Sequence, residues 1–303
     1  MQTRWISLLV AGVALVGAAS ATADDHHEPS PEFRVTPLTA KLSLLQGRGG
    51  NIAVLSGPEG LLVVDAAFAD MAPALEQTLQ DMGTGPVRYL VNTHWHGDHT
   101  GGNAALGALT RIAHENVRER LSTPQPRPGG STAQPLPVEG LPQITFDDGL
   151  RIHWGDEVVR VRHLPGGHTD GDAVVYFPQA GVVHTGDLFF SGRFPFIDGS
   201  SGGDLHAYTV NVARLLEQMG DDTRIIPGHG PLSTPDDLRR FHRMLVDTQA
   251  WAAARRAEGL SVEQAIERGL PDTWQGWGAG FVNENSWIQT LYASAEQQGA
   301  ATP

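Results

Sequence analysis

The amino-acid sequence predicts one mixed α/β domain, and three observations lead to this fold class. Apolar, strand-like runs alternate with helical patterns from about residue 33 onward, with no convincing linker between them. The 303 residues, 40% of them hydrophobic, are enough to bury a sizeable core. The chain has no repeat with a period of about 20–50 residues, which argues against a solenoid.

Short apolar runs rich in β-branched residues predict the strands. Glycine- and proline-rich turns bound several of them, for example Gly57-Pro58 and Gly166-Gly167. The stretch 122–142 contains six prolines and little periodicity, so we expect a surface loop there. The predicted strands cover residues 52–55, 61–64, 87–91, 158–161, 173–177 and 181–184.

Helical patterns lie between and after these strands. Residues 72–82 and 205–219 have helical patterns, and the second of these ends at Gly220. A further helix is predicted to open at 233–237, where a capping residue is followed by proline and two acids. Ser261 and Gln264 form the capping box of another. We therefore expect the domain to end in helices from about residue 235.

The first residues have the pattern of a secretory signal. Arg4 precedes an apolar run over 5–19, and Ala21-Thr22-Ala23 fits the small-residue cleavage rule. The run is shorter than the roughly 20 residues that span a bilayer, although an uncleaved anchor stays an alternative. We expect residues 1–23 to be a signal peptide, 24–32 a disordered polar leader and 33–303 the domain. The mature protein is then exported, periplasmic or secreted, without stable membrane association.

Composition excludes several classes of chemistry. The net charge of −13 disfavours binding to nucleic acid and to anionic lipid. Lys41 is the only lysine, which leaves little material for phosphate-binding loops or Schiff bases. Cysteine is absent, so disulfides, thiolate nucleophiles and cysteine metal ligands are excluded. The 13 histidines are therefore the place to look for a reactive site.

Four potential metal ligands lie within six residues directly after the predicted strand 87–91. His94 and His96 are two residues apart, so at a strand end both imidazoles point the same way. Asp98 and His99 follow a glycine that permits a sharp turn. Nitrogen and oxygen ligands in such density are typical of a zinc site with an open position for catalysis.

With these residues the chain resembles the metallo-β-lactamase-fold superfamily of metal-dependent hydrolases. His94-Trp95-His96-Gly97-Asp98-His99 matches its HxHxDH motif. Four further motifs follow the family order: Asp65 at the end of an apolar strand, Gly167-His168, Gly186-Asp187 and Gly228-His229. The resemblance implies an αββα sandwich of two mixed β-sheets flanked by helices.

The resemblance also implies a ligand set for two Zn²⁺ ions per chain, although iron or manganese is not excluded. His94, His96 and His168 would hold the first ion, and Asp98, His99 and His229 the second, with Asp187 as the bridge. Asp65 would hold a ligating imidazole in its tautomer from behind. His184, close before Asp187, is a candidate for a similar supporting role.

The implied activity is hydrolysis of an ester, thioester, lactone or related acyl bond in a small molecule. A hydroxide shared by the two ions would attack the carbonyl, and Asp98 would orient it. A periplasmic class B-like β-lactamase is one alternative, and a non-catalytic metal-binding accessory protein is another. The chain has no G-x-S-x-G motif to support a serine hydrolase.

Substrate contacts are predicted from a missing cation and from the aromatic residues that come after Asp187. One class of true β-lactamases carries a lysine three residues after the position of Asp187, where this chain has Phe190. Arg48 and Arg193 are the candidates to replace that cation. Phe194 and Phe196 are candidates for an apolar wall of the substrate pocket.

Overall fold

The fold was analysed in a computed structural model that describes residues 32–126 and 130–300. These residues belong to one compact unit. The predicted signal peptide and all of the predicted leader except Glu32 lie outside the described residues. Within the described part, no helix combines the length and the apolar character needed to cross a bilayer.

The first β-sheet has seven strands and is mixed. Its order is β1-β2-β3-β4-β5-β6-β9, antiparallel from β1 to β4 and parallel from β4 to β9. Val64 of β4 lies opposite Val91 of β5, so these two strands end side by side. The bounds are β1 (Arg34–Pro37), β2 (Leu42–Gln46), β3 (Ile52–Gly57), β4 (Gly60–Val64), β5 (Val87–Val91), β6 (Thr110–His114) and β9 (Ile144–Phe146).

The second sheet has five strands in the simple order β10-β11-β12-β13-β14. Its pairs are antiparallel except β13 with β14, where His184 lies opposite Ile226. The bounds are β10 (Gly149–Trp154), β11 (Glu157–His163), β12 (Ala173–Phe177), β13 (Val182–His184) and β14 (Arg224–Ile226).

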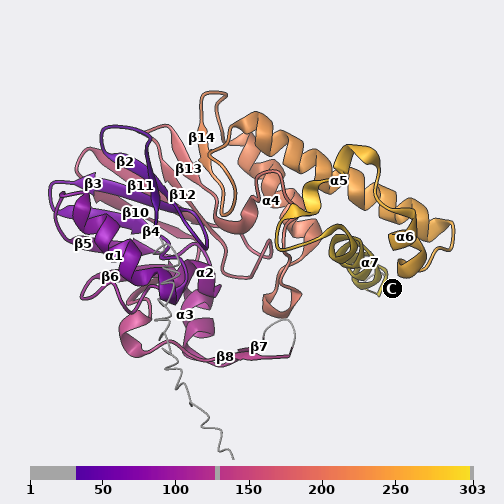
Figure 1. Ribbon diagram of the computed structural model, residues 1–303, viewed down its shortest axis with the longest axis horizontal. Coiled ribbons are helices and arrows are strands. Elements are labelled where there is room, and N and C mark those ends of the chain that lie inside the picture. Colours follow the sequence, from indigo (N-terminus) through magenta and orange to yellow (C-terminus); the bar gives the residue numbers. More distant parts are fainter. Residues whose placement is uncertain (1–31, 127–129, 301–303) are drawn as a thin grey trace, which may run out of the picture. The chain divides into compact units, whose positions relative to one another are not determined.

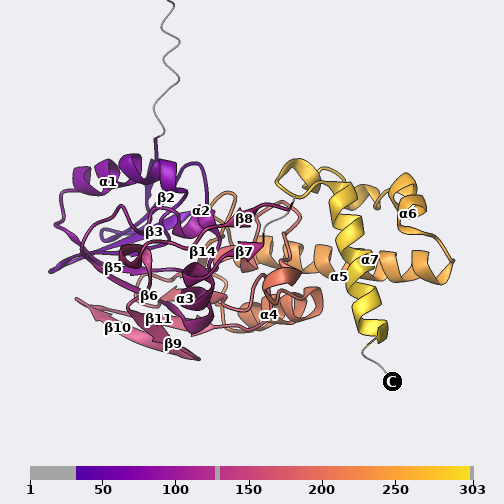
Figure 2. The ribbon, with the colours of Figure 1, turned by 90° about the horizontal axis from the view of Figure 1, so that it is seen from below.

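The two sheets pack face to face and helices cover their outer faces, which confirms the expected αββα sandwich (Figures 1 and 2). Inward side chains of both sheets form one buried cluster, with Leu44 and Leu62 from the first sheet and Val159 and Val175 from the second. The outer face of the first sheet packs on α1 (Ala72–Asp81). Burying these faces is the main stabilisation of the fold.

The outer face of the second sheet packs against the larger helical layer. Val183 and Ile225 of this sheet share a cluster with α4 (Leu205–Glu217), α5 (Pro235–Ala257) and α7 (Glu284–Ala300). The remaining helices are α2 (Gly97–Thr100), α3 (Glu115–Ser122) and α6 (Val262–Arg268), with short 3₁₀ turns η1 (Ala69–Met71), η2 (Val138–Gly140), η3 (Gly186–Leu188), η4 (Gly199–Ser201), η5 (Asp272–Trp274) and η6 (Trp277–Ala279).

The predicted elements are all present, with ends that differ by at most two residues. The capping boxes are confirmed as well: Thr234 pairs with Asp237 at the start of α5, and Ser261 pairs with Gln264 at the start of α6. The predicted loop at 122–142 differs in one respect. It contains a short hairpin of β7 (Gln125–Pro126) and β8 (Thr132–Ala133).

Candidate metal centre

Seven side chains meet at the end of the sandwich where β4, β5, β13 and β14 finish. One group of potential metal ligands consists of His94, His96, His168 and Asp187, and a second consists of Asp98, His99 and His229. Within each group the ligand atoms lie within 4.8 Å of one another. Residues from 94 to 229 in the sequence are therefore brought to one point by the two sheets. These are the seven ligands that the sequence predicts.

The first group is buried except for His96, whose side chain is 16% exposed. His94 and His168 are each 1% exposed. The Nε2 atom of His168 lies 2.8 Å from Nδ1 of His96, and the rings of His94 and His168 meet edge to face at 4.7 Å. Three imidazoles thus face a common point.

The second group is more open to solvent. His99 is fully buried, whereas the side chains of Asp98 and His229 are 23% and 19% exposed. Nε2 of His229 lies 3.2 Å from Oδ2 of Asp98 and 3.3 Å from Nε2 of His99. The exposed edges of Asp98 and His229 are the side from which a substrate can approach.

Asp187 lies between the two groups. Its carboxylate oxygens are 3.4 Å from Nε2 of His168 and 3.9 Å from Nε2 of His94 in the first group. They are 3.1 Å from Nε2 of His99 and 3.4 Å from Nε2 of His229 in the second. Gly228 lets the backbone pass close to this carboxylate, because a Cβ there would collide with Oδ1 of Asp187. The arrangement is that of a carboxylate able to serve both groups.

Hydrogen bonds on the far side of each ring set the imidazole tautomers. His168 Nδ1 donates to the Phe196 carbonyl at 2.7 Å, and His99 Nδ1 donates to Asp65 at 2.8 Å. His96 uses the opposite nitrogen and donates from Nε2 to Asp198 at 2.9 Å. Since carbonyl and carboxylate oxygens only accept, the other nitrogen of each ring presents its lone pair to the site whenever the ring is neutral.

Asp65 lies directly behind His99, where it could play the supporting role predicted for it. Besides His99, its carboxylate accepts hydrogen bonds from the backbone N–H and the hydroxyl of Thr93, both at 2.8 Å. Thr93 in turn lies 3.1 Å from Nδ1 of His94. Asp65 adopts a left-handed φ of 67° directly after β4, which is uncommon for a residue with a Cβ. This turn aims the carboxylate at the metal-binding loop.

His184 forms hydrogen bonds with backbone groups near the site and with none of the candidate ligand rings. Its Nδ1 accepts a hydrogen bond from Gly186 N at 3.1 Å, and its Nε2 donates to the Asn51 carbonyl at 3.0 Å. The Asn51 side chain donates to the carbonyls of Pro227 and Gly230, on either side of His229. His184 and Asn51 therefore connect the Asp187 turn to the His229 turn.

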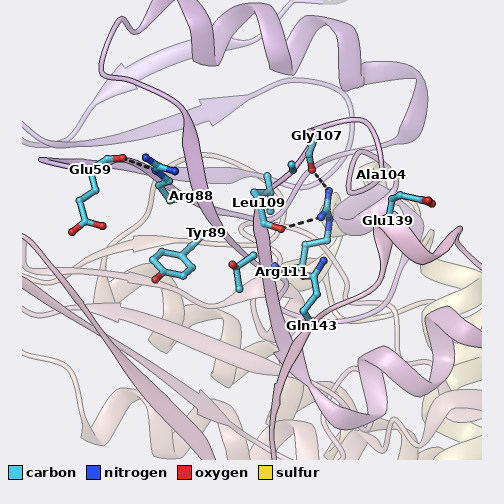
Figure 3. A pocket seen from close by; sticks show the side chains of 11 residues that line it. Glu59, Arg88, Tyr89, Ala104, Gly107, Leu109, Arg111, Glu139 and Gln143 are labelled. Carbon is cyan, nitrogen blue, oxygen red and sulfur yellow. Dashed lines mark hydrogen bonds between the residues drawn. The ribbon is translucent and has the colours of Figure 1, made fainter.

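The loop that carries His94 to His99 is also held from behind. Asn92 and Asn103 exchange side-chain hydrogen bonds of 3.1 and 2.8 Å. The buried guanidinium of Arg111 donates to the carbonyls of Asn103, Gly107 and Leu109. Figure 3 shows Arg111 between Gly107 and Leu109 at the edge of an open hollow on this side of the protein. These contacts occupy Arg111 in a structural role.

The pKa values of the histidines differ between the two groups. Burial lowers the pKa of His168 to about 4 and the pKa of His94 well below its usual value, so both rings are neutral ligands at pH 7. For His229 burial acts in the same direction, but Asp187 and Asp98 together outweigh it and raise the pKa to about 9. Burial opposes ionisation of Asp187, yet the surrounding imidazoles hold its pKa well below the usual range.

The donor set fits divalent metal ions. His94 Nε2 and Asp187 Oδ1 are buried and make no hydrogen bond to any other described residue. Buried polar atoms are normally satisfied, so atoms left over at the same point indicate a missing partner. Imidazole and carboxylate are ligands that suit zinc and related ions.

Only some of the residues predicted to contact substrate line the cleft. Five of the seven candidate ligands line a cleft of about 760 Å³, and Arg193 and Phe196 line it as well; these five are His96, Asp98, His168, Asp187 and His229. Arg48 instead pairs with Asp70 and stacks over Phe68, and it does not line the cleft. Phe194 touches the cleft but is only 1% exposed, because it packs into the core of the helical layer.

Sequence reasoning missed several residues of the site. Asp198 lies in no motif, and nothing in its neighbours indicates that it reaches His96. The Phe196 carbonyl is a backbone group and leaves no mark on the sequence. Asn51 holds the His229 turn from 176 residues away. Pairing with a distant residue defines each of these roles, so the local sequence carries no signal for them.

Comparison with known proteins agrees with this geometry. The sequence profile of the metallo-beta-lactamase superfamily matches residues 45–229, which is more than half of the chain. The acyl-coenzyme A thioesterase MBLAC2 of Gallus gallus is 28% identical over 217 residues, or 64% of this chain and 77% of that protein. A hydroxyacylglutathione hydrolase of Gloeothece citriformis is 33% identical over 148 residues, or 46% of this chain and 49% of that protein.

A solved structure shows the same fold. The metallo-beta-lactamase from Pontibacter korlensis superposes with a TM-score of 0.60 at 20% sequence identity. The superposition covers 71% of this chain and 100% of that one. The profile match, the αββα sandwich and the cluster at its end agree, and the chain belongs to the metallo-beta-lactamase superfamily.

Proposed function

We propose that this protein is a metal-dependent hydrolase that cleaves an ester, thioester, lactone or related acyl bond in a small molecule. One observation carries the proposal: the Asp187 carboxylate lies between two groups of metal-binding side chains on the floor of a substrate-sized cleft. The relatives support the reaction class, since one is named as a thioesterase and one as a hydroxyacylglutathione hydrolase.

In this proposal His94, His96 and His168 hold one divalent ion, and Asp98, His99 and His229 hold a second. Asp187 contributes to both. When bound, two such ions lower the pKa of a water molecule towards neutrality and polarise a carbonyl group. Zinc is the expected metal from the donor set, with iron and manganese as the alternatives that a metal analysis distinguishes.

The chain's own residues perform the remaining tasks. The neutral rings of His94 and His168 present lone pairs at pH 7 because burial disfavours their protonated forms. Asp98 stays ionised, because His99 and His229 together outweigh the effect of burial and lower the pKa to about 2. Its partly exposed carboxylate can therefore accept a hydrogen bond from the attacking water and orient it towards the substrate carbonyl.

The reaction adds one water across the acyl bond. The acyl carbon gains the hydroxyl group, and the leaving oxygen or sulfur gains the proton. The cleft contains no side chain of the lysine or cysteine type to form a covalent intermediate, because the only lysine is Lys41 and cysteine is absent. Direct attack by water is then the simplest route.

The decisive experiment combines metal analysis with a substrate screen. Purified protein with its metals is tested on a penicillin, a carbapenem, a lactone, a thioester and a simple ester. We expect metal-dependent turnover of the ester, thioester or lactone that is lost with a chelator and restored by zinc. Metal binding without turnover of any of these compounds would favour the alternative of a non-catalytic accessory protein.

A β-lactamase is the second candidate, and Arg193 is the observation that favours it. This arginine lines the cleft and makes no ion pair with another described residue. It is therefore available to bind a substrate carboxylate. A carbapenem or penicillin hydrolysed with a kcat/KM far above that of the other substrates would establish this candidate instead.

We also propose that the protein acts outside the cytoplasm, on the basis of the signal-like pattern in residues 1–23. Expression of the full chain with N-terminal sequencing of the exported product tests this. Cleavage after Ala23 is the expected result. A product that retains Arg4 and stays with the membrane would instead indicate an anchor.

A further inference from the structure

One wall of the cleft is contributed by a part of the chain that lies beyond the superfamily match. That match ends at residue 229, whereas Phe281 lies between η6 and α7 in the C-terminal helices. Figures 1 and 2 show these helices beside the sandwich. Phe281 nevertheless lines the same cleft as the metal-binding residues. The C-terminal helices therefore shape the site.

Phe281 and Phe196 form a continuous aromatic surface that leads away from the first ligand group. The two rings meet edge to face with their centroids 5.6 Å apart. Phe196 is in turn 5.9 Å from the His96 ring and 6.0 Å from the His168 ring. A substrate with its reacting bond at these histidines would extend along both phenylalanines.

The exposure of Phe281 is the second observation. It is 80% exposed, the highest value among the large apolar side chains that the structure describes. Burying such a ring against a ligand is favourable, because apolar surface is removed from water. An exposed ring beside a reactive cleft is thus a place where an apolar ligand gains affinity.

The segment that carries Phe281 is fixed by contacts with buried residues. Phe194 N donates a hydrogen bond of 3.1 Å to the Trp277 carbonyl, and the Phe194 ring stacks on Trp287 at 5.6 Å. Trp277 and Trp287 are both buried. These contacts join the segment that carries Phe196 to the segment that carries Phe281, so the two rings stay side by side.

Further apolar side chains line the cleft. Trp95 and Leu121 belong to a buried cluster that includes part of α3, and Leu136 packs against that cluster. A longer apolar group can therefore bury more surface in the cleft than a small group such as acetyl.

We propose that Phe281, together with Phe196, is a specificity-determining surface that binds the apolar portion of the substrate. This inference rests on the proposed hydrolase function. The preferred substrates are then acyl compounds with a medium-length apolar chain or an aromatic ring, and selection among them comes from the C-terminal helices. Short acyl compounds are poor substrates for lack of contact.

The test compares chain-length dependence in the zinc-loaded wild type and in Phe281→Ala. One series varies the acyl chain of ethyl esters from acetate through butyrate to octanoate, with release of the acid followed by titration. A second series keeps acetyl and lengthens the alcohol. For the wild type we expect kcat/KM to rise along one series by about two- to fourfold per buried methylene. In Phe281→Ala the rise should flatten, with about tenfold lost on the longest substrate and little change for acetate.

Val246→Ala is the matched control, because Val246 is an exposed apolar side chain of the same helical region but does not line the cleft. It should leave the chain-length dependence unchanged. Phe281→Leu should keep part of the preference. Equal losses on short and long substrates in Phe281→Ala, or no loss in either series, would overturn the inference while leaving the hydrolase itself established.

A binding measurement separates this inference from the proposed function. Hexanoate and acetate are titrated calorimetrically into the zinc-loaded wild type and Phe281→Ala. We expect hexanoate to bind at least tenfold more tightly than acetate in the wild type, and this difference to shrink in the variant. If hexanoate shows this preference but none of the esters is hydrolysed, the apolar binding surface is supported and the proposed hydrolase function is rejected. Equal preference in both proteins would reject the surface.

Discussion

His96 and Asp198 are joined by a hydrogen bond of 2.9 Å between Nε2 and Oδ2, across 102 residues of sequence. The bond turns Nδ1 of His96 towards His168 and the first ligand group. Asp65 holds His99 of the second group in the same way, but from the opposite ring nitrogen. Each group therefore has its own carboxylate that orients one imidazole from behind.

This arrangement predicts that the two carboxylates act on different ions. Asp198→Ala should weaken binding of the first ion by about ten- to a hundredfold, as loss of such a partner typically does. Asp65→Ala should instead weaken binding of the second. Competition titrations with a chromogenic chelator measure both constants. Asp156→Ala is the control, since this carboxylate is exposed and pairs only with Lys41. Weakening of the second ion alone by Asp198→Ala would contradict the assignment.

Asp187 and Asp98 should differ in what they contribute. Asp187→Asn removes the charge that faces both groups, so we expect both ions to bind more weakly. Asp98→Asn should leave the first ion in place and lower kcat by about a hundredfold or more, because it weakens a ligand of the second ion and removes the charge that orients the attacking water. Metal content after gel filtration, measured beside kcat, separates the two effects. An Asp187→Asn protein with two tightly held ions and wild-type turnover would refute this division.

Metal removal should destabilise the folded protein. A ligand that binds only the folded state stabilises it by about 4 kcal/mol at a thousandfold excess over its Kd. We expect elemental analysis to give close to two equivalents of metal, and a chelator to lower the melting temperature by several degrees. Readdition of zinc should restore both the metal content and the melting temperature. Active protein that reproducibly contains no metal would contradict the whole site assignment.

The pKa shifts predict different proton release at the two groups. In the metal-free protein His94 and His168 are neutral at pH 7, so filling the first group releases almost no protons from them. His229 has a pKa of about 9 and carries a proton at pH 7, which the second ion must displace. Affinity for the second ion should therefore rise with pH between about 7 and 9, whereas His94 and His168 add no pH dependence to the affinity for the first ion in that range. Calorimetric titrations in buffers of different ionisation enthalpy count the protons, and equal release in both steps would contradict the prediction.

Arg193 should matter only for substrates that carry an anion. A charge-assisted hydrogen bond contributes about 1.5–3 kcal/mol, so Arg193→Gln should lower kcat/KM for a carboxylate-bearing substrate by about ten- to a hundredfold. A neutral ester should be affected little. Arg48→Gln is the control, because Arg48 pairs with Asp70 away from the cleft. Equal losses on both substrates would show that Arg193 acts on structure rather than on charge recognition.

Helices and strands that depend on residues close together in the sequence could be predicted from the sequence alone. The capping boxes at Thr234 and Ser261 are set by residues three positions apart, and both helices begin where these residues predict. The strand β4 is fully buried and reads as a continuous apolar run. Other strands were not predicted, among them β6, which is short, contains Arg111 and becomes a strand only by pairing with β5 and β9.

The sequence by itself determined which seven side chains are candidates to bind metal, because the motifs that contain these histidines and aspartates are local in sequence. It also indicated Asp65 as a candidate to support one of them. Only the tertiary structure decided which residues hold and surround that site. Asp198 reaches His96, Arg193 rather than Arg48 faces the cleft, and Phe281 joins Phe196 from the C-terminal helices. The physical reason is that orientation and substrate contact depend on packing between distant segments, which no local pattern records.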